Sequence, residues 1–218
     1  MTASTERASP RAGALTPLSA HAALLAQASS DAARLVLREC GFVTQLNLRG
    51  DAADAAFAAA AGSALGCPLP VAANTWSGTP EKGALWLGPD EWLLVAPEAE
   101  RVPLEAALRA ALAGRHHSLV DVSANRTVIE VASADARAVL AKGCPLALHA
   151  AGFAPPQCAQ TLLAKSQMIL QACETTPVFR LYVRNSFAHY VAQWLADAAA
   201  ESAASRSLDS DRIAARLR

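Results

Sequence analysis

The sequence has no excess of charge of either sign, because 19 Lys and Arg balance 19 Asp and Glu among its 218 residues. Proteins that bind nucleic acid through phosphate contacts need a surplus of Lys and Arg, so we expect no nucleic-acid partner. The sequence also lacks a charge-free apolar run of about 18 residues, so we expect no membrane-spanning helix. Its start lacks the apolar segment after basic residues that is typical of a secretory signal, and we therefore expect a cytoplasmic protein.

Motifs for several common activities are also absent. The sequence contains no glycine-rich phosphate loop and no H-E-x-x-H metal motif. The five cysteines lie at least 14 positions apart, so there is no C-x-x-C pair. A chain of this length buries a sufficient core without disulfides, which favours reduced thiols. The sequence thus predicts no catalytic, cofactor-binding or metal-binding site on this chain.

Composition divides the chain into a central body and two terminal segments. Residues 1–30 are rich in Ser, Thr, Ala and Pro and have no hydrophobic period, which predicts a flexible arm with one short helix near residues 21–28. In the body, residues 31–200, strand and helix patterns alternate. Residues 201–218 are rich in Ala, Ser, Asp and Arg and are predicted to form a tail.

The first half of the body, about residues 43–122, combines strand and helix patterns. Asp51 is placed to cap an Ala-rich helix, and Gly66 is placed to end it. Gly88-Pro89-Asp90 predicts the turn of a hairpin. The expected elements are a strand at 43–48, a helix ending near 65, strands at 84–87 and 91–96, a helix at 103–113 and a strand at 117–122.

The second half, about residues 127–198, shows a similar succession. Ser133 is the expected cap of its first helix. The last helix carries its large apolar residues on one stripe. The expected elements are a strand at 127–131, a helix at 134–141, strands at 161–164, 167–171 and 178–183, and a helix at 187–198.

A short sequence repeat links the two halves. Leu-Gly-Cys-Pro-Leu at 65–69 recurs as Lys-Gly-Cys-Pro-Leu at 142–146, each time after a strand and an Ala-rich helix. The order of elements predicts an α+β fold of duplicated βαββα-type units. Such units would form two small antiparallel sheets or one continuous sheet, with helices packed on them.

Polar residues near strand ends are the first candidates for functional contacts. His117, Asp121 and Ser123 share one face of a predicted strand, but the strand rise of about 3.3 Å per residue spreads them too far for a compact catalytic triad. Asp121 is either a turn-closing residue or, with Arg126, a contact for a ligand or partner. Arg49 and Arg184 follow other predicted strands and are either solvated or paired at an interface.

Tryptophans are the second kind of candidate. Trp86 and Trp92 flank the predicted hairpin turn, and Trp76 precedes it. They pack in the core, or they anchor a subunit interface, and neither role excludes the other. Our interface candidates are Arg49, Trp86, Trp92, Asp121, Arg126 and Arg184.

The segment LWLGPDEWLL at 85–94 resembles the gamma-subunit family of heterotetrameric sarcosine oxidase. The resemblance continues in the same order over about residues 43–198. The other segments that carry it are LNLRG at 46–50, DVS at 121–123, LAKGCPL at 140–146, Phe153, CAQTL at 158–162 and RNSFAHY at 184–190.

The resemblance implies a fold similar to the folate-binding domain of glycine-cleavage aminomethyltransferases. It also implies a cytoplasmic complex that oxidises sarcosine to glycine and hydrogen peroxide and, with tetrahydrofolate, forms methylenetetrahydrofolate. The partners would be alpha, beta and delta subunits, which would carry FAD, FMN, NAD, tetrahydrofolate and zinc. No catalytic residue is known on the gamma subunits of this family, so this chain would be a non-catalytic assembly subunit.

Two alternatives to this function remain open at the level of sequence. One is a free-standing protein that binds folate or resembles an aminomethyltransferase. The other is the equivalent subunit of a complex that acts on a different N-methylated amine, since the substrate contacts would lie in another chain.

Overall fold

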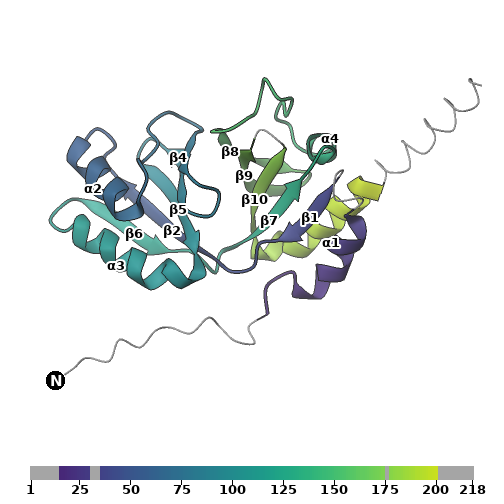
Figure 1. Ribbon diagram of the computed structural model, residues 1–218, viewed down its shortest axis with the longest axis horizontal. Coiled ribbons are helices and arrows are strands. Elements are labelled where there is room, and N and C mark those ends of the chain that lie inside the picture. The colour runs from purple at the N-terminus through teal and green to yellow at the C-terminus, as the bar shows by residue number, and fades with distance from the viewer. Residues whose placement is uncertain (1–14, 30–34, 175–176, 201–218) are drawn as a thin grey trace, which may run out of the picture.

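The computed structural model describes residues 15–29, 35–174 and 177–200. They form four layers, in which two five-stranded antiparallel sheets stack face to face and helices cover the outer face of each (Figure 1). The predicted α+β class is confirmed, and two separate sheets form rather than one continuous sheet. The predicted tail, residues 201–218, lies outside the described residues.

The first sheet is built from the first half of the body, in the order β3-β4-β5-β2-β6. Its outer face packs against helices α2 (Ala55–Leu65) and α3 (Arg101–Ala111), and Phe57 and Leu108 from these helices are buried against Trp92 and other apolar residues of the sheet. The strands are β2 (Val43–Gly50), β3 (Trp76–Gly78), β4 (Gly83–Gly88), β5 (Glu91–Pro97) and β6 (His117–Asp121).

The second sheet has the order β1-β7-β10-β9-β8. Helices α1 (Ala22–Ala28) and α4 (Ala136–Ala141) and the helical residues 188–200 pack on its outer face. Its strands are β1 (Val36–Glu39), β7 (Arg126–Ala132), β8 (Cys158–Leu163), β9 (Ser166–Glu174) and β10 (Val178–Arg184), and three 3₁₀ turns occur at Ser19–His21, Glu98–Glu100 and Asn185–Phe187.

The two sheets repeat one topology. In each, an opening strand is followed by a helix and three strands, and the opening strand lies beside the last of those three, giving β3-β4-β5-β2 and β8-β9-β10-β7. The similar segments 65–69 and 142–146 occupy equivalent places at the ends of α2 and α4. The unit is therefore βαβββα rather than βαββα: the three strands after the helix were expected in the second half, and β3 is the strand that was missed in the first. Strands β6 and β1 complete the two sheets next to β2 and β7.

Two predicted helix caps are wrong. Asp54, not Asp51, caps α2, because its carboxylate accepts hydrogen bonds from the backbone N–H groups of Ala56 and Phe57 at 2.9 and 3.1 Å. Asp51 instead accepts from the N–H of Ala53 at 2.8 Å and closes the preceding turn. Gly66 ends α2 as predicted, with a φ of 91° that favours glycine.

The second wrong cap is Ser133. Helix α4 begins at Ala136, three residues later, and Ser133 adopts a φ of 84° in the preceding turn. A residue in this left-handed conformation lies outside the first turn of a helix, and the residue that flanks α4 is Asp135.

The described part of the predicted flexible arm is folded. The expected short helix is confirmed as α1, and residues of the segment 15–29 pack on the second sheet of the same chain. Leu18 and Leu25 are only 1% and 2% exposed and belong to the core of the second sheet. Burial of these two leucines fixes the segment on its own domain.

The inner faces of the two sheets form a separate apolar layer. It is joined by hydrogen bonds between the sheets, including one from the indole Nε1 of Trp76 to the carbonyl oxygen of Ala172 at 2.8 Å. The layer consists of Trp76, Leu85, Leu93 and Val95 from the first sheet and Val128, Cys158, Ile169 and Tyr182 from the second. This layer brings the two halves together, and the candidates Asp121 and Arg126 lie at their junction.

Candidate functional site at the junction of the two halves

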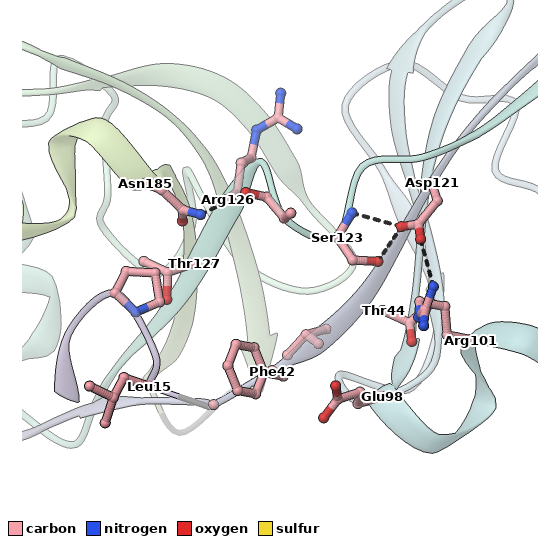
Figure 2. Close-up of a pocket in the computed structure, with 14 residues that line it drawn as sticks. Leu15, Phe42, Thr44, Glu98, Arg101, Asp121, Ser123, Arg126, Thr127 and Asn185 are labelled. Carbon is pink, nitrogen blue, oxygen red and sulfur yellow. Dashed lines mark hydrogen bonds and ion pairs between the residues drawn. The ribbon is translucent and has the colours of Figure 1, made fainter. Parts of the chain in front are cut away.

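A pocket of about 250 Å³ lies where residues 122–125 carry the chain from β6 to β7, and so from the first sheet to the second (Figure 2). Its wall combines segments that are far apart in the sequence. The residues that line it are Leu15, Pro17, Gly41, Phe42, Val43, Thr44, Glu98, Arg101, Asp121, Ser123, Ala124, Arg126, Thr127 and Asn185.

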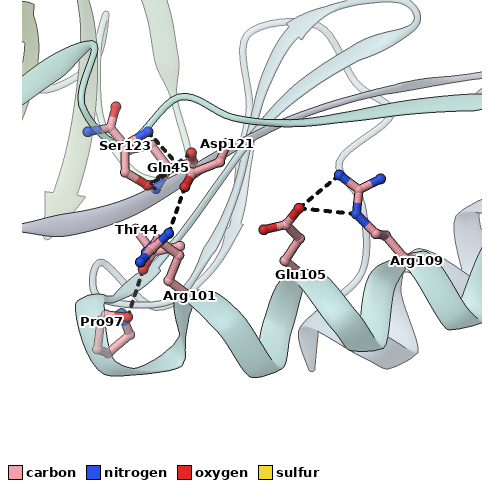
Figure 3. A network of polar contacts seen from close by, with 8 residues as sticks. All are labelled: Thr44, Gln45, Pro97, Arg101, Glu105, Arg109, Asp121 and Ser123. Carbon is pink, nitrogen blue, oxygen red and sulfur yellow. Dashed lines mark hydrogen bonds and ion pairs between the residues drawn. The ribbon is translucent and has the colours of Figure 1, made fainter. Parts of the chain in front are cut away.

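Asp121 is the centre of the polar contacts in this pocket (Figure 3). Its Oδ1 accepts hydrogen bonds from the N–H and the hydroxyl of Ser123 at 2.9 and 2.6 Å, and its Oδ2 pairs with Nη1 of Arg101 at 3.0 Å. Burial alone would raise the pKa of Asp121. The bonds from Ser123 and Arg101 outweigh that effect, so the pKa of Asp121 is lowered.

Ser123 joins this carboxylate to the first sheet. Its Oγ accepts a hydrogen bond from the backbone N–H of Gln45 at 2.9 Å, and the side chain of Gln45 donates from Nε2 to the carbonyl oxygen of Arg126 at 2.8 Å. These bonds tie β2 to both ends of the connecting loop. The turn-closing role that we considered for Asp121 is therefore present in the structure.

The same contacts argue against a triad. The carboxylate of Asp121 is bonded to Ser123 and Arg101, and Nδ1 of His117 lies 2.9 Å from the carbonyl oxygen of Arg115. The structure therefore does not bring His117, Asp121 and Ser123 together as a catalytic set. This agrees with the spacing argument made from the sequence.

Arg126 and Arg184 are brought together instead. They lie directly opposite each other in the pairing of β7 with β10. The guanidinium of Arg126 points away from the junction pocket (Figure 2), and both arginines line a second cavity of about 350 Å³. Burial and the neighbouring Arg184 lower the pKa of Arg126, partly offset by the charge of Glu91.

Arg49, another interface candidate, is paired within the chain. Its Nη2 lies 2.7 Å from Oε2 of Glu91, whose other oxygen accepts a hydrogen bond from the amide of Asn47 at 2.8 Å. The side chain of Arg49 remains 54% exposed. An exposed pair of this kind contributes little to stability and leaves the arginine accessible.

The two hairpin tryptophans have different environments, although they are cross-strand partners. Trp92 is fully buried, lies with its ring tilted against that of Phe57, and donates from Nε1 to the carbonyl oxygen of Pro70 at 2.8 Å. As an interface candidate Trp92 is therefore wrong, and core packing is its role. Trp86 is partly exposed and keeps a surface that a partner can contact.

A charged network between the sheets was missed by the sequence analysis. Arg180 donates from Nη2 to Oε1 of Glu81 at 2.8 Å and also donates to the carbonyl oxygen of Pro80, both in the first sheet's β3–β4 loop. Its Nε lies 3.5 Å from Glu130, which pairs with Arg38 at 2.7 Å. The signal in the sequence is an arginine alternating with large apolar residues in β10, which places a charge on a buried face.

The buried thiols are poor nucleophiles. Burial raises the pKa values of Cys158 and Cys173 to about 12 and also raises that of Cys40. Within the residues that the structure describes, no group of three or more His, Cys, Asp and Glu side chains is arranged to hold a metal ion. Among those same residues, no helix has both the length and the apolar character that a membrane crossing requires.

Comparison with protein families and known proteins gives consistent matches. The family model described as "Sarcosine oxidase, gamma subunit family" matches residues 49–201. The chain is 38% identical to sarcosine oxidase subunit gamma of Arthrobacter sp over 177 residues, which cover 80% of this chain and 84% of the relative. It is also 38% identical to the subunit of that name from Corynebacterium sp. (strain P-1) over 175 residues, with the same coverage of both.

Solved structures agree with these matches. A chain of the heterotetrameric sarcosine oxidase from Corynebacterium sp. U-96 superposes with a TM-score of 0.80 and 34% identity, over 86% of this chain and 95% of that chain. The glycine cleavage system aminomethyltransferase T from Bartonella henselae superposes with a TM-score of 0.54 over 80% of this chain and 48% of that chain. At 15% identity, this second likeness is one of fold alone.

Proposed function

Because this chain belongs to the sarcosine oxidase gamma subunit family, we propose that it is the non-catalytic assembly subunit of a heterotetrameric sarcosine oxidase in the cytoplasm. The observation that carries the proposal is the superposition on almost the whole of a chain from a heterotetrameric sarcosine oxidase, at 34% identity. The partners would be the alpha, beta and delta subunits.

In this proposal the chemistry takes place on the other subunits. The complex oxidises the N-methyl group of sarcosine with oxygen, releases glycine and hydrogen peroxide, and passes the one-carbon unit to tetrahydrofolate as methylenetetrahydrofolate. FAD, FMN, NAD, tetrahydrofolate and zinc would be held by the partner chains. This chain would contribute a rigid surface, and a permanent interface of this kind buries more than about 2,000 Å².

Two features of the described residues support a non-catalytic role. The carboxylate of Asp121 is held by two hydrogen bonds from Ser123 and by the ion pair with Arg101. Burial keeps the thiols of Cys158 and Cys173 protonated at neutral pH. These features favour a structural role for the junction pocket over a catalytic one.

Co-expression with the three partner subunits tests this proposal. We expect the chain to copurify with them in a complex whose intact mass includes one copy of each subunit. The double variant Asp121→Asn/Ser123→Ala should leave turnover of sarcosine per bound flavin near the wild-type value in the complex that assembles. A hundredfold fall in that normalised turnover would mean that the junction pocket takes part in the chemistry.

The same preparation distinguishes the alternatives. A wild-type chain that stays alone in the presence of the partners and binds tetrahydrofolate would support a free-standing folate-binding protein instead. If the complex assembles but oxidises another N-methylated amine faster than sarcosine, the assembly role of this chain stands and the proposed substrate is wrong.

A further inference from the structure

The pairing of Arg126 with Arg184 places two positive charges directly opposite each other across antiparallel strands. Cross-strand neighbours have side chains close enough to interact, and like charges in this arrangement destabilise the sheet. The two residues stand at the end of the β7–β10 ladder, on the face of the second sheet that is turned toward the first. The arrangement is unfavourable for the chain by itself.

The other arginines in the described part of the chain have partners. Arg38, Arg49, Arg101, Arg109, Arg115 and Arg180 pair with carboxylates, and Arg137 donates to two carbonyl oxygens and lies over the ring of Phe179. Within those same residues, the guanidinium groups of Arg126 and Arg184 have neither a carboxylate nor a carbonyl partner. Glu91 acts on Arg126 only at a distance and is itself paired with Arg49.

The cavity in front of the two arginines is suited to a polar group at the end of a side chain. Its volume is about 350 Å³, and the polar residues around the arginines are Gln160, Thr161 and Gln167. The amide of Gln160 also donates to the carbonyl oxygen of Leu87 in the first sheet at 2.8 Å, so the cavity lies beside the boundary between the two sheets. Leu162, which borders the cavity, is 42% exposed and offers apolar contact area.

We propose that Arg126 and Arg184 together bind the carboxylate of an acidic side chain from a partner subunit of the complex. The inference rests on the proposed function, since it requires an assembly. A carboxylate is the group that planar guanidinium donors bind with two parallel hydrogen bonds, and one negative charge between the two arginines offsets their repulsion. The exposed Leu162 beside them supplies apolar surface. A protein partner would cover this surface, whereas an isolated small anion would not.

This arrangement has an experimental signature that a purely structural pair lacks. Removing one arginine relieves repulsion in the free chain but removes a contact in the complex. Arg184→Gln should therefore leave the melting temperature of the free chain unchanged or higher, while the complex dissociates at about tenfold higher concentration or more. Arg184→Glu should have both effects more strongly, because it pairs with Arg126 within the chain and repels the partner's carboxylate.

The test uses the full complex and mass photometry over a dilution series at 50 and 300 mM NaCl, with unfolding of the free chain followed in parallel. Salt should weaken the wild-type complex more than the Arg184→Gln and Arg126→Gln complexes, since the variants have lost a charge contact. Arg109→Gln is the matched control, because Arg109 is an exposed arginine on α3 paired with Glu105, and it should dissociate like the wild type.

The outcomes separate this inference from the proposed function. If the wild-type chain does not assemble, the proposed function fails. If the wild type assembles and the Arg126 and Arg184 variants dissociate no more readily than Arg109→Gln, the assembly role stands and the carboxylate site is wrong. If those variants assemble normally while phosphate or citrate raises the melting temperature of the wild-type free chain but not of Arg184→Gln, the site binds a small anion and the partner contact is overturned.

Discussion

Trp76 and Ala172 are joined by a buried hydrogen bond between the two sheets, from the indole Nε1 of one to the carbonyl oxygen of the other at 2.8 Å. Trp76 belongs to the three-residue strand β3, and Ala172 belongs to β9 of the opposite sheet. The backbone N–H of Trp76 also donates to the carbonyl oxygen of Pro156 at 2.8 Å, so Trp76 is tied to the second half of the chain at two points. The bond therefore helps to fix how the two halves stack. The stacking in turn sets the positions of the surfaces that the complex would use.

Replacing Trp76 with Phe keeps an aromatic ring and removes the donor. The carbonyl oxygen of Ala172 then loses its partner from the first sheet, and we expect the free energy of unfolding to fall by about 1–3 kcal/mol. Urea denaturation followed by circular dichroism measures this change. Trp86→Phe is the control, because Trp86 is partly exposed, and it should change the free energy by no more than about 0.5 kcal/mol. Equal effects of the two substitutions would contradict a special role for the inter-sheet bond.

The environment of Asp121 should make the stability of the folded chain depend on pH. Its pKa is lower in the folded chain than the value of about 3.9 for an unfolded aspartate. The ionised carboxylate therefore stabilises the fold fully above the unfolded pKa, and this contribution is lost as the pH falls through the lower folded pKa. The difference in melting temperature between the wild type and Asp121→Asn should be largest near pH 6 and should shrink toward pH 3.

A second variant tests the cause of this pH dependence. Ser123→Ala removes the hydroxyl that donates to Asp121 but keeps the backbone N–H and Arg101. The melting temperature of this variant should fall less than that of the wild type as the pH is lowered, but part of the fall should remain. A difference between the wild type and Asp121→Asn that is the same at pH 3 and pH 6 would show that the carboxylate charge does not stabilise the junction.

Local patterns in the sequence predicted the parts of the fold that depend on near neighbours. The hairpin at β4 and β5 follows from alternating apolar residues around Gly88-Pro89-Asp90, and the repeated Gly-Cys-Pro segments mark the ends of α2 and α4. The strands β1 and β3, with four and three residues, were missed. Each is too short to show a period, and each forms by pairing with another strand: β3 with the neighbouring β4, and β1 with the distant β7.

The candidate site divides in the same way. The contacts of Asp121 with Ser123 span two residues, so turn chemistry was sufficient to anticipate them. The juxtaposition of Arg126 and Arg184 depends on the register of β7 with β10, which only the tertiary fold sets. The burial of Trp92 depends likewise on which face of the hairpin the helices cover, and the sequence left that choice open.

Leu18 tests whether the segment before β1 is part of the folded domain. Its side chain is 1% exposed in the core of the second sheet, so Leu18→Ala should lower the free energy of unfolding of the free chain by about 2–5 kcal/mol. Leu15→Ala is the matched control, because Leu15 is 81% exposed and should have an effect of about 0.5 kcal/mol or less. If Leu18→Ala matched its control in urea denaturation, the segment would not be anchored on this chain.

The cysteines report on the inter-sheet layer through their reactivity. Burial raises the pKa values of Cys158 and Cys173 to about 12, so both thiols are almost entirely protonated at pH 8. Cys67 is half-buried beside a surface hollow at the end of α2 and is accessible to reagent. With iodoacetamide at pH 8, mass spectrometry of the folded chain should find Cys67 alkylated well before Cys158 and Cys173.

The control is the unfolded chain. In denaturant all five cysteines should react at similar rates, which would show that the protection comes from the fold. Cys158 lies in the apolar layer between the sheets, so its modification in the folded chain as fast as that of Cys67 would mean that the two sheets separate readily, against the stacking described above.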